Sequence, residues 1–131
     1  MPVDTILSKI EIQDLTARHF RAIDYGETDA YLATWLPDGE LVLGSQRWQG
    51  HQALQKYFSS LAASEGDVRR LVSNFTISIK TNGQATQHCY LVTYSLPTNQ
   101  LVFLSECNDR LARSNEGWKF AQRIIHSCSS R

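Results

Sequence analysis

The chain has 131 residues, of which 42% are hydrophobic and 20% are charged, the composition of one ordinary globular domain. Thirteen basic residues balance thirteen acidic ones, so no net positive charge favours binding to nucleic acid or to an anionic membrane. No run of about eighteen apolar residues occurs, which excludes an ordinary transmembrane helix. We therefore expect a single domain over residues 1–131 without nucleic-acid or membrane partners.

The cysteine content and the N-terminal segment predict a cytoplasmic location. Cys89, Cys107 and Cys128 form no C-x-x-C pair, and their odd number leaves one over from any disulfide pairing. The N-terminal segment carries Asp4 and Glu11 and lacks the uninterrupted apolar stretch of a secretory signal. Because no phosphate-binding, dinucleotide-binding or zinc-type motif is present, we expect neither a metal nor a cofactor.

The first half of the sequence has mostly helical periodicity. Asp4 is a candidate N-cap for a long helix, and Gly26 is expected to end it. Pro37-Asp38-Gly39 is a turn signal after a second, short helix. The predicted elements are helices over residues 5–23, 30–35 and 51–63, a strand over 40–44 and a loop over 47–50.

The second half changes to the two-residue alternation of strands, and Thr81-Asn82-Gly83 is a hairpin signal within it. Four long antiparallel strands are predicted over residues 71–79, 85–95, 101–113 and 118–126. Helices followed by such a meander indicate the α+β class, with the helices packed on one face of a strongly curved sheet.

Four stretches of the chain resemble the SnoaL-like branch of the nuclear transport factor 2-like superfamily. They are EIQDLTARHFRAIDYGETDAYLATWLPDGEL from Glu11, the helix start at Gly50, RRLVSNFTI from Arg69 and NDRLARSNEGWKFAQRII from Asn108. The resemblance implies a cone-shaped α+β barrel, in which a curved, mostly antiparallel sheet wraps three N-terminal helices. The family includes hydrolases, isomerases, dehydratases, polyketide cyclases and members without assigned activity, so the fold does not imply one reaction.

Two branches of this superfamily imply different functions. In proteins that look like scytalone dehydratase, Asp24 and Ser105 match the expected polar groups, whereas Arg70, Cys107 and Ile23 replace the expected His, Asn and Tyr. The small β subunit of ring-hydroxylating dioxygenases is similar to this chain in RRLVSNF and over residues 109–123. That resemblance implies a structural partner of a larger catalytic subunit.

Three residues are candidates for catalysis: Asp24, His19 and Arg70. Asp24 is expected at the mouth of the cone as a general base or an acceptor that orients water, although a carboxylate capping the Gly26 turn is the alternative. His19 follows Leu15 at helical spacing, so it is expected to point inward as a proton relay or as a core residue, and it could pair with Asp24 or Arg70.

Alternation along the strands predicts the walls of a binding pocket. Arg70 and Asn74 are expected on one strand face as donors to an enolate, phenolate or carboxylate, unless Arg70 is paired with Glu65 or Asp67 at an edge. The remaining candidates for substrate contact are Phe103, Ser105 and Cys107 on one strand face, Tyr90 in its strand, and Trp48 in a loop that could form a rim. Asp109, Arg110 and Arg123 are expected to be cross-strand salt-bridge partners on neighbouring strands.

Two hypotheses follow. In the first, the cone binds a small hydrophobic or aromatic molecule, on which a cofactor-free lyase, isomerase or hydrolase acts by general acid–base catalysis. In the second, the chain is a non-catalytic subunit or oligomerisation module that binds a larger catalytic partner. A homodimer is expected in both, because apolar residues on the outer face of the sheet need a cover. An open cone would favour the first hypothesis, and a filled cone with paired polar groups the second.

Overall fold

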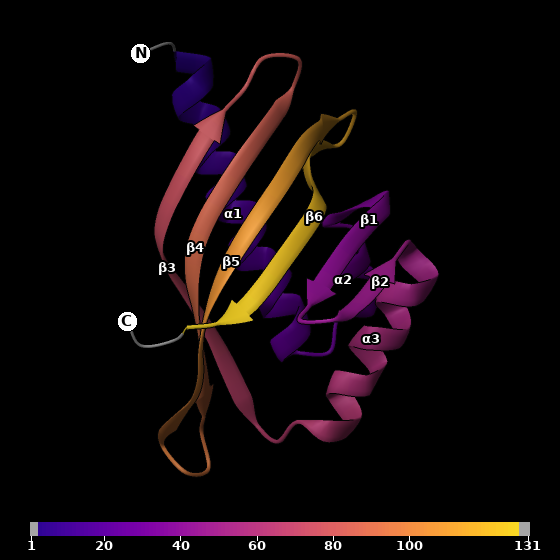
Figure 1. Cartoon of the computed structure of the whole chain (residues 1–131), viewed down its shortest axis with the longest axis vertical. Coiled ribbons are helices and arrows are strands. Elements are labelled where there is room, and N and C mark those ends of the chain that lie inside the picture. The colour runs from indigo at the N-terminus through magenta and orange to yellow at the C-terminus, as the bar shows by residue number, and fades with distance from the viewer. Residues whose placement is uncertain (1–2, 129–131) are drawn as a thin grey trace.

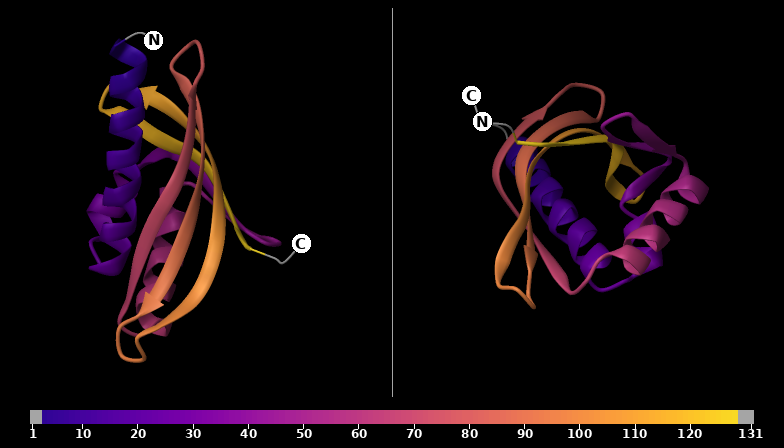
Figure 2. Two further views of the ribbon diagram at one scale, coloured as in Figure 1. Left: turned by 90° about the vertical axis from the view of Figure 1, so that its left-hand side faces the viewer. Right: turned by 60° about the horizontal axis from the view of Figure 1, so that its bottom comes forward.

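The computed structural model describes residues 3–128 as a curved sheet with three helices against its concave face (Figures 1 and 2). The sheet has six strands in the order β2-β1-β6-β5-β4-β3. The elements are α1 (Val3–Asp24), α2 (Thr28–Leu32), β1 (Trp35–Leu43), β2 (Gln46–Gln49), α3 (His51–Ser64), β3 (Val68–Ile79), β4 (Gln84–Ser95), β5 (Gln100–Ser114) and β6 (Gly117–Ser127).

The predicted meander is confirmed as strands β3 to β6, which pair antiparallel in sequence order. Strand β1 adds a parallel pair with β6 and an antiparallel pair with β2. Because β2 and β3 are the two edges, the sheet stays open, and the α+β cone is closed by helices rather than by strand pairing.

The prediction of a turn at Pro37-Asp38-Gly39 is wrong. Helix α2 ends at Leu32, and these three residues lie inside β1, where the register with β6 shifts between Trp35 and Glu40. A bulge of this kind accommodates a proline, because the bulged residues leave the hydrogen-bond ladder. The segment predicted as a loop over residues 47–50 instead supplies the edge strand β2.

A second bulge changes the pocket wall. The register of β3 against β4 shifts between Ser73 and Thr76, and Asn74 at this point has a left-handed backbone with φ of 57°. An extra residue in a strand reverses the alternation of the residues that follow it. Phe75 and Ile77 therefore face the core, Asn74 is exposed, and the prediction that Asn74 shares a face with Arg70 is wrong.

The core lies between α1 and the sheet and is rich in aromatic side chains. The rings of Tyr31, Trp35 and Phe120 surround the His19 ring at centroid distances between 4.9 and 5.6 Å. Beside them, Arg123 donates from Nε to Asp109 across β5 and β6 over 2.9 Å, which confirms the salt bridge predicted for these two residues. Arg110 instead donates to the amide oxygen of Gln122. In the described part of the chain, no helix is long and apolar enough to cross a membrane.

Candidate functional site

A pocket of about 420 Å³ lies between the C-terminal half of α1, helix α3 and the concave face of the sheet. This volume is in the range of sites for small organic ligands. Most of its wall is aliphatic or aromatic, with Phe20 and Ile23 from α1, Leu61 from α3, and Leu91, Phe103 and Ile125 from the sheet. The walls therefore favour a largely apolar ligand.

His19 is a neutral imidazole in the pocket wall. The Thr34 hydroxyl donates its one proton to the carbonyl oxygen of Tyr31 over 2.6 Å, so it accepts from Nδ1–H of His19 over 2.8 Å. That assignment leaves the lone pair on Nε2. Burial, reinforced by the charges of Arg123 and Arg70, holds the pKa of His19 well below 6.5. His19 thus pairs with Thr34 and with neither Asp24 nor Arg70, the two partners expected from the sequence.

Tyr31 also lines the pocket, although its residue is fully buried in the fold. Its Oη is a buried polar atom whose proton has no acceptor among residues 3–128, and the indole N–H of Trp35, also buried without an acceptor, is close enough to lower the pKa of Tyr31. Burial raises the pKa of Tyr31, so the side chain stays a phenol and keeps its proton. Since an unpaired buried hydroxyl costs free energy, a ligand oxygen that accepted from Tyr31 would remove that cost.

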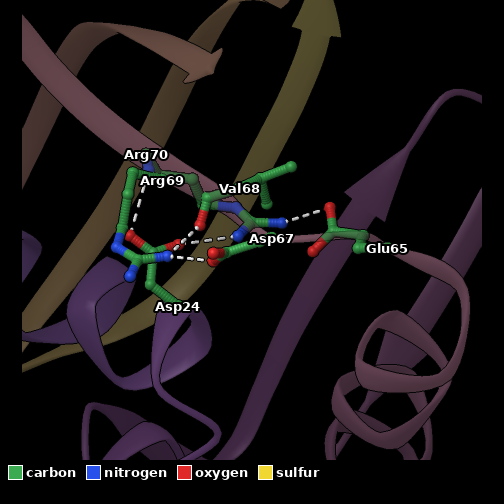
Figure 3. A network of polar contacts seen from close by, with 6 residues as sticks. All are labelled: Asp24, Glu65, Asp67, Val68, Arg69 and Arg70. Carbon is green, nitrogen blue, oxygen red and sulfur yellow. Dashed lines mark hydrogen bonds and ion pairs between the residues drawn. The ribbon is translucent and has the colours of Figure 1, made fainter. Parts of the chain in front are cut away.

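Arg70 lies between two carboxylates at another part of the wall (Figure 3). Its Nη1 donates to Asp24 Oδ1 over 2.8 Å and its backbone N–H to Asp24 Oδ2 over 2.9 Å. Its Nη2 donates to Glu65 Oε2 over 2.5 Å. Burial alone would lower the pKa of Arg70, but the bonds to Glu65 and Asp24 outweigh it and raise that pKa above its ordinary value.

The triad of Asp24, Glu65 and Arg70 limits the chemical roles that Asp24 and Arg70 can have. The side chains of Asp24 and Arg70 are only 6% and 7% exposed, and they form an ion pair with each other. With Glu65 the triad carries one carboxylate charge in excess, so an incoming anion would be repelled and would compete for a guanidinium already bound. The geometry therefore supports the alternative in which Arg70 is paired. Asp24 is not free to act as the expected general base, and Arg70 is not free to donate hydrogen bonds to an anionic substrate.

The other sequence-predicted residues divide between the pocket and other parts of the fold. Phe103 and Ser105 line the pocket together with His19 and Arg70. Cys107 is fully buried and lies beside the lining residues, in the cluster formed with Phe20, Cys89 and Leu91. The three remaining candidates lie outside the pocket wall: Asn74 at the exposed bulge, Tyr90 with 38% exposure on the outer sheet face, and Trp48 against the Tyr57 ring at 4.7 Å.

Six polar lining residues escaped the sequence-based prediction of the site: Tyr31, Tyr57, Glu65, Thr93, His126 and Ser127. Thr93 could have been found, because it lies two residues from Leu91 on β4 and directly opposite Phe103 on β5. Tyr31 gives no such signal, since it comes from a five-residue helix whose position depends on tertiary packing. Within residues 3–128, no group of three or more His, Cys, Asp or Glu side chains could hold a metal ion.

Comparisons with known proteins place this architecture among known folds. The model of the SnoaL-like domain family matches residues 4–124. No curated protein matches the chain.

Several solved structures share the fold. A protein of unknown function with a cystatin-like fold from Nostoc punctiforme is 25% identical, with a TM-score of 0.86 and coverage of 93% of this chain and 92% of the other. Two proteins from Novosphingobium aromaticivorans are similar in structure. One, described as a candidate aromatic ring hydroxylase, has a TM-score of 0.85 at 20% identity and coverage of 95% and 92%. The other, described as a candidate scytalone dehydratase, has a TM-score of 0.85 at 16% identity and coverage of 98% and 89%.

Proposed function

Since this chain belongs to the SnoaL-like family, whose model covers residues 4–124, we propose that its pocket binds a small, uncharged, largely apolar molecule. The observation that carries the proposal is the combination of apolar walls with an unpaired Tyr31 hydroxyl and a neutral His19. A ketone or phenol of aromatic character fits these groups, because its ring contacts the apolar walls and its oxygen accepts from Tyr31.

The chemistry that we propose for this pocket is cofactor-free proton transfer. Nε2 of His19 is the acceptor, the Thr34 hydroxyl orients the ring through Nδ1, and Tyr31 donates to the substrate oxygen as negative charge develops on it. Because burial disfavours the imidazolium, His19 would hold a proton only briefly and return it to the same substrate. Such a transfer is suited to an isomerase or a lyase rather than to a reaction that needs a permanently charged base.

The test is a thermal-shift screen with matched pairs of neutral and anionic aromatic compounds. Aromatic ketones and phenols should raise the melting temperature, and the corresponding carboxylic acids should not, because a ligand that binds only the folded state stabilises it. Tyr31→Phe should weaken the shift, since it removes the donor alone, whereas Tyr90→Phe on the outer face should leave it unchanged. Stabilisation by acids but not by ketones would contradict the proposal.

The structural-subunit hypothesis also has an observation in its favour. Asp24, Glu65 and Arg70 saturate one another, as expected for polar groups with a structural role. One solved structure of this fold, at 20% identity, is described as a candidate aromatic ring hydroxylase. Native mass spectrometry of protein purified from cells distinguishes the two functions, because a larger chain bound at fixed stoichiometry would support the subunit and a bound small molecule the pocket.

A further inference from the structure

Two buried cysteines that the proposed function does not use lie side by side in the sheet. Cys89 on β4 and Cys107 on β5 are directly opposite in the antiparallel register, and both are fully buried. Their thiols are free, and both pack in one cluster with Phe20 and Leu91.

The register sets the spacing of the two cysteines. Arg113 N–H donates to Gly83 O over 2.8 Å, which makes these two residues a hydrogen-bonded pair. The register continues without a shift to Thr93 and Phe103, and Cys89 lies an even number of residues from Gly83, so the cysteines form the same type of pair. Such pairs have Cα atoms about 5.5 Å apart, inside the span of roughly 4.4–6.8 Å that a disulfide bridges. Their Cβ atoms are about 5 Å apart, so the two strands must approach slightly for the Cβ atoms to reach the roughly 3.5–4.5 Å of a disulfide, which makes the bond strained and readily reduced.

The charge beside the cysteines favours a thiolate on one of them. Arg123 is fully buried, and its Nη1 has no hydrogen-bond partner among the described residues. A hydrogen bond from Cys89 lowers the pKa of Cys107, against burial, which raises it. The Arg123 charge lowers this pKa further, and the charge of its partner Asp109 opposes that effect. The same hydrogen bond, together with burial, raises the pKa of Cys89. Cys107 is therefore the nucleophile of the pair, and Cys89 keeps the shared proton.

The pocket lies close to the pair, although neither cysteine is among its lining residues. Leu91 and Ser105, the next pair on the same face of β4 and β5, both line the pocket. The Cys89–Cys107 pair lies two residues further along the same strands, and Phe20, which packs against it, is itself a lining residue. A molecule the size of hydrogen peroxide that enters the pocket thus comes within one residue pair of the sulfur atoms.

We propose that Cys89 and Cys107 are a peroxide-sensitive dithiol that closes to an intramolecular disulfide between β4 and β5. The Cys107 thiolate attacks one peroxide oxygen, the O–O bond breaks, and the leaving hydroxide takes up the proton that Cys107 released, which gives a sulfenic acid and water. The Cys89 sulfur then attacks the sulfenic sulfur, the S–S bond forms, and the S–O bond breaks. The departing hydroxide takes the Cys89 proton as a second water, so one peroxide is reduced and two thiols are oxidised.

The test uses the full chain with Cys128→Ser, so that only the pair can react. After treatment of the folded, reduced protein with hydrogen peroxide, unfolding, alkylation and peptide mapping should show loss of both free thiols and a peptide linked through Cys89 and Cys107. In Cys89→Ser and in Cys107→Ser, made in the same background, the remaining thiol should give no linked peptide. The wild-type chain, mapped in the same way, guards against a folding defect in the variants.

Several results would overturn the proposal. One is that both thiols are alkylated after peroxide treatment as fully as in untreated protein. Another is that the two cysteines are oxidised separately to sulfinic acids, and a third is that the linked peptides join two chains. A pair that closes as readily in the chemically unfolded chain as in the folded one would also contradict it, since the fold would then not be what brings the sulfur atoms together.

Discussion

At the residue scale, removal of Arg70 should be costly because it leaves the buried Asp24 carboxylate without its partner. We expect Arg70→Met to lower the free energy of unfolding by about 3–5 kcal/mol, the cost of breaking a buried ion pair from one side. Glu65→Gln should cost much less, because Glu65 is 26% exposed and the Asp24 contacts remain. Urea unfolding of both variants measures the difference.

The single variant Asp24→Asn and the double variant Asp24→Asn/Arg70→Met complete a double-mutant cycle, in which the double variant is the informative one. It removes the charge that Arg70→Met leaves uncompensated, so it should regain part of the lost stability. If the double variant is as unstable as the sum of the single ones, Asp24 and Arg70 do not depend on each other, contrary to the geometry in Figure 3.

His19 should make the stability of the fold depend on pH. The pKa of His19 in the folded chain lies well below 6.5, its value in the unfolded chain. At a pH between these two pKa values, the unfolded chain binds a proton at His19 and the folded chain does not. The contribution of His19 is complete above pH 6.5 and is lost as the pH falls, with a slope approaching about 1.4 kcal/mol per pH unit. Urea unfolding between pH 7.5 and 5 measures it.

The matched variants separate this histidine from the others. His19→Gln should lack this component of the pH dependence, whereas His88→Gln should keep it, because His88 is partly exposed on the outer face and contacts Glu106. Equal pH dependence in the wild type and in His19→Gln would show that His19 is not buried as a neutral ring.

At the scale of the elements, the bulge in β1 depends on Gly39. A Cβ at this position would lie 2.6 Å from Cε3 of Trp35, whose ring is fully buried and cannot move away. We expect Gly39→Ala to lower the free energy of unfolding by about 1–3 kcal/mol, the usual cost of overpacking. Thermal and urea unfolding check this.

Gly66→Ala is the control for this prediction, because a Cβ at Gly66 meets nothing within 4 Å and the backbone there is not left-handed. It should unfold like the wild type, or slightly later, since alanine restricts the unfolded chain. A Gly39→Ala variant as stable as Gly66→Ala would mean that the Trp35 ring adapts to the added methyl group.

At the scale of the whole molecule, the outer face of the sheet carries an uncovered apolar row. Leu71, Val92 and Leu104 lie side by side in the registers of β3, β4 and β5, and Leu71 and Leu104 are 56% and 42% exposed. We propose that a second copy of the chain covers this row in a homodimer. Light scattering at micromolar concentration should then give about twice the chain mass for the wild type and the monomer mass for Leu104→Glu.

Ile10→Glu tests the other exposed apolar surface. Ile10 is 59% exposed on α1, where Val3, Ile6 and Leu7 are also exposed. This variant should remain dimeric if the outer sheet face is the interface. Dissociation by Ile10→Glu and not by Leu104→Glu would move the interface to α1, and a wild-type monomer would contradict the dimer itself.

The sequence by itself determined the class of the fold, because periodicity is a local property of the chain. The change from helical spacing to two-residue alternation gave the helices and the four long strands, and the alternation around Asp109 and Arg123 gave their pairing in the sheet. The inward direction of His19 followed from its spacing to Leu15 on the same helix, and both residues are buried.

The composition of the pocket was decided by the tertiary structure. The bulge at Asn74 turns that side chain outward, an effect that strict alternation cannot predict because one extra residue reverses the face. Glu65 was a possible partner of Arg70 from the sequence, but the choice of Glu65 over Asp67, the second partner Asp24 and the His19 partner Thr34 follow only when α1, α2 and the loop after α3 converge. Charge and protonation at the site depend on these distances, which packing sets and residue identity alone does not.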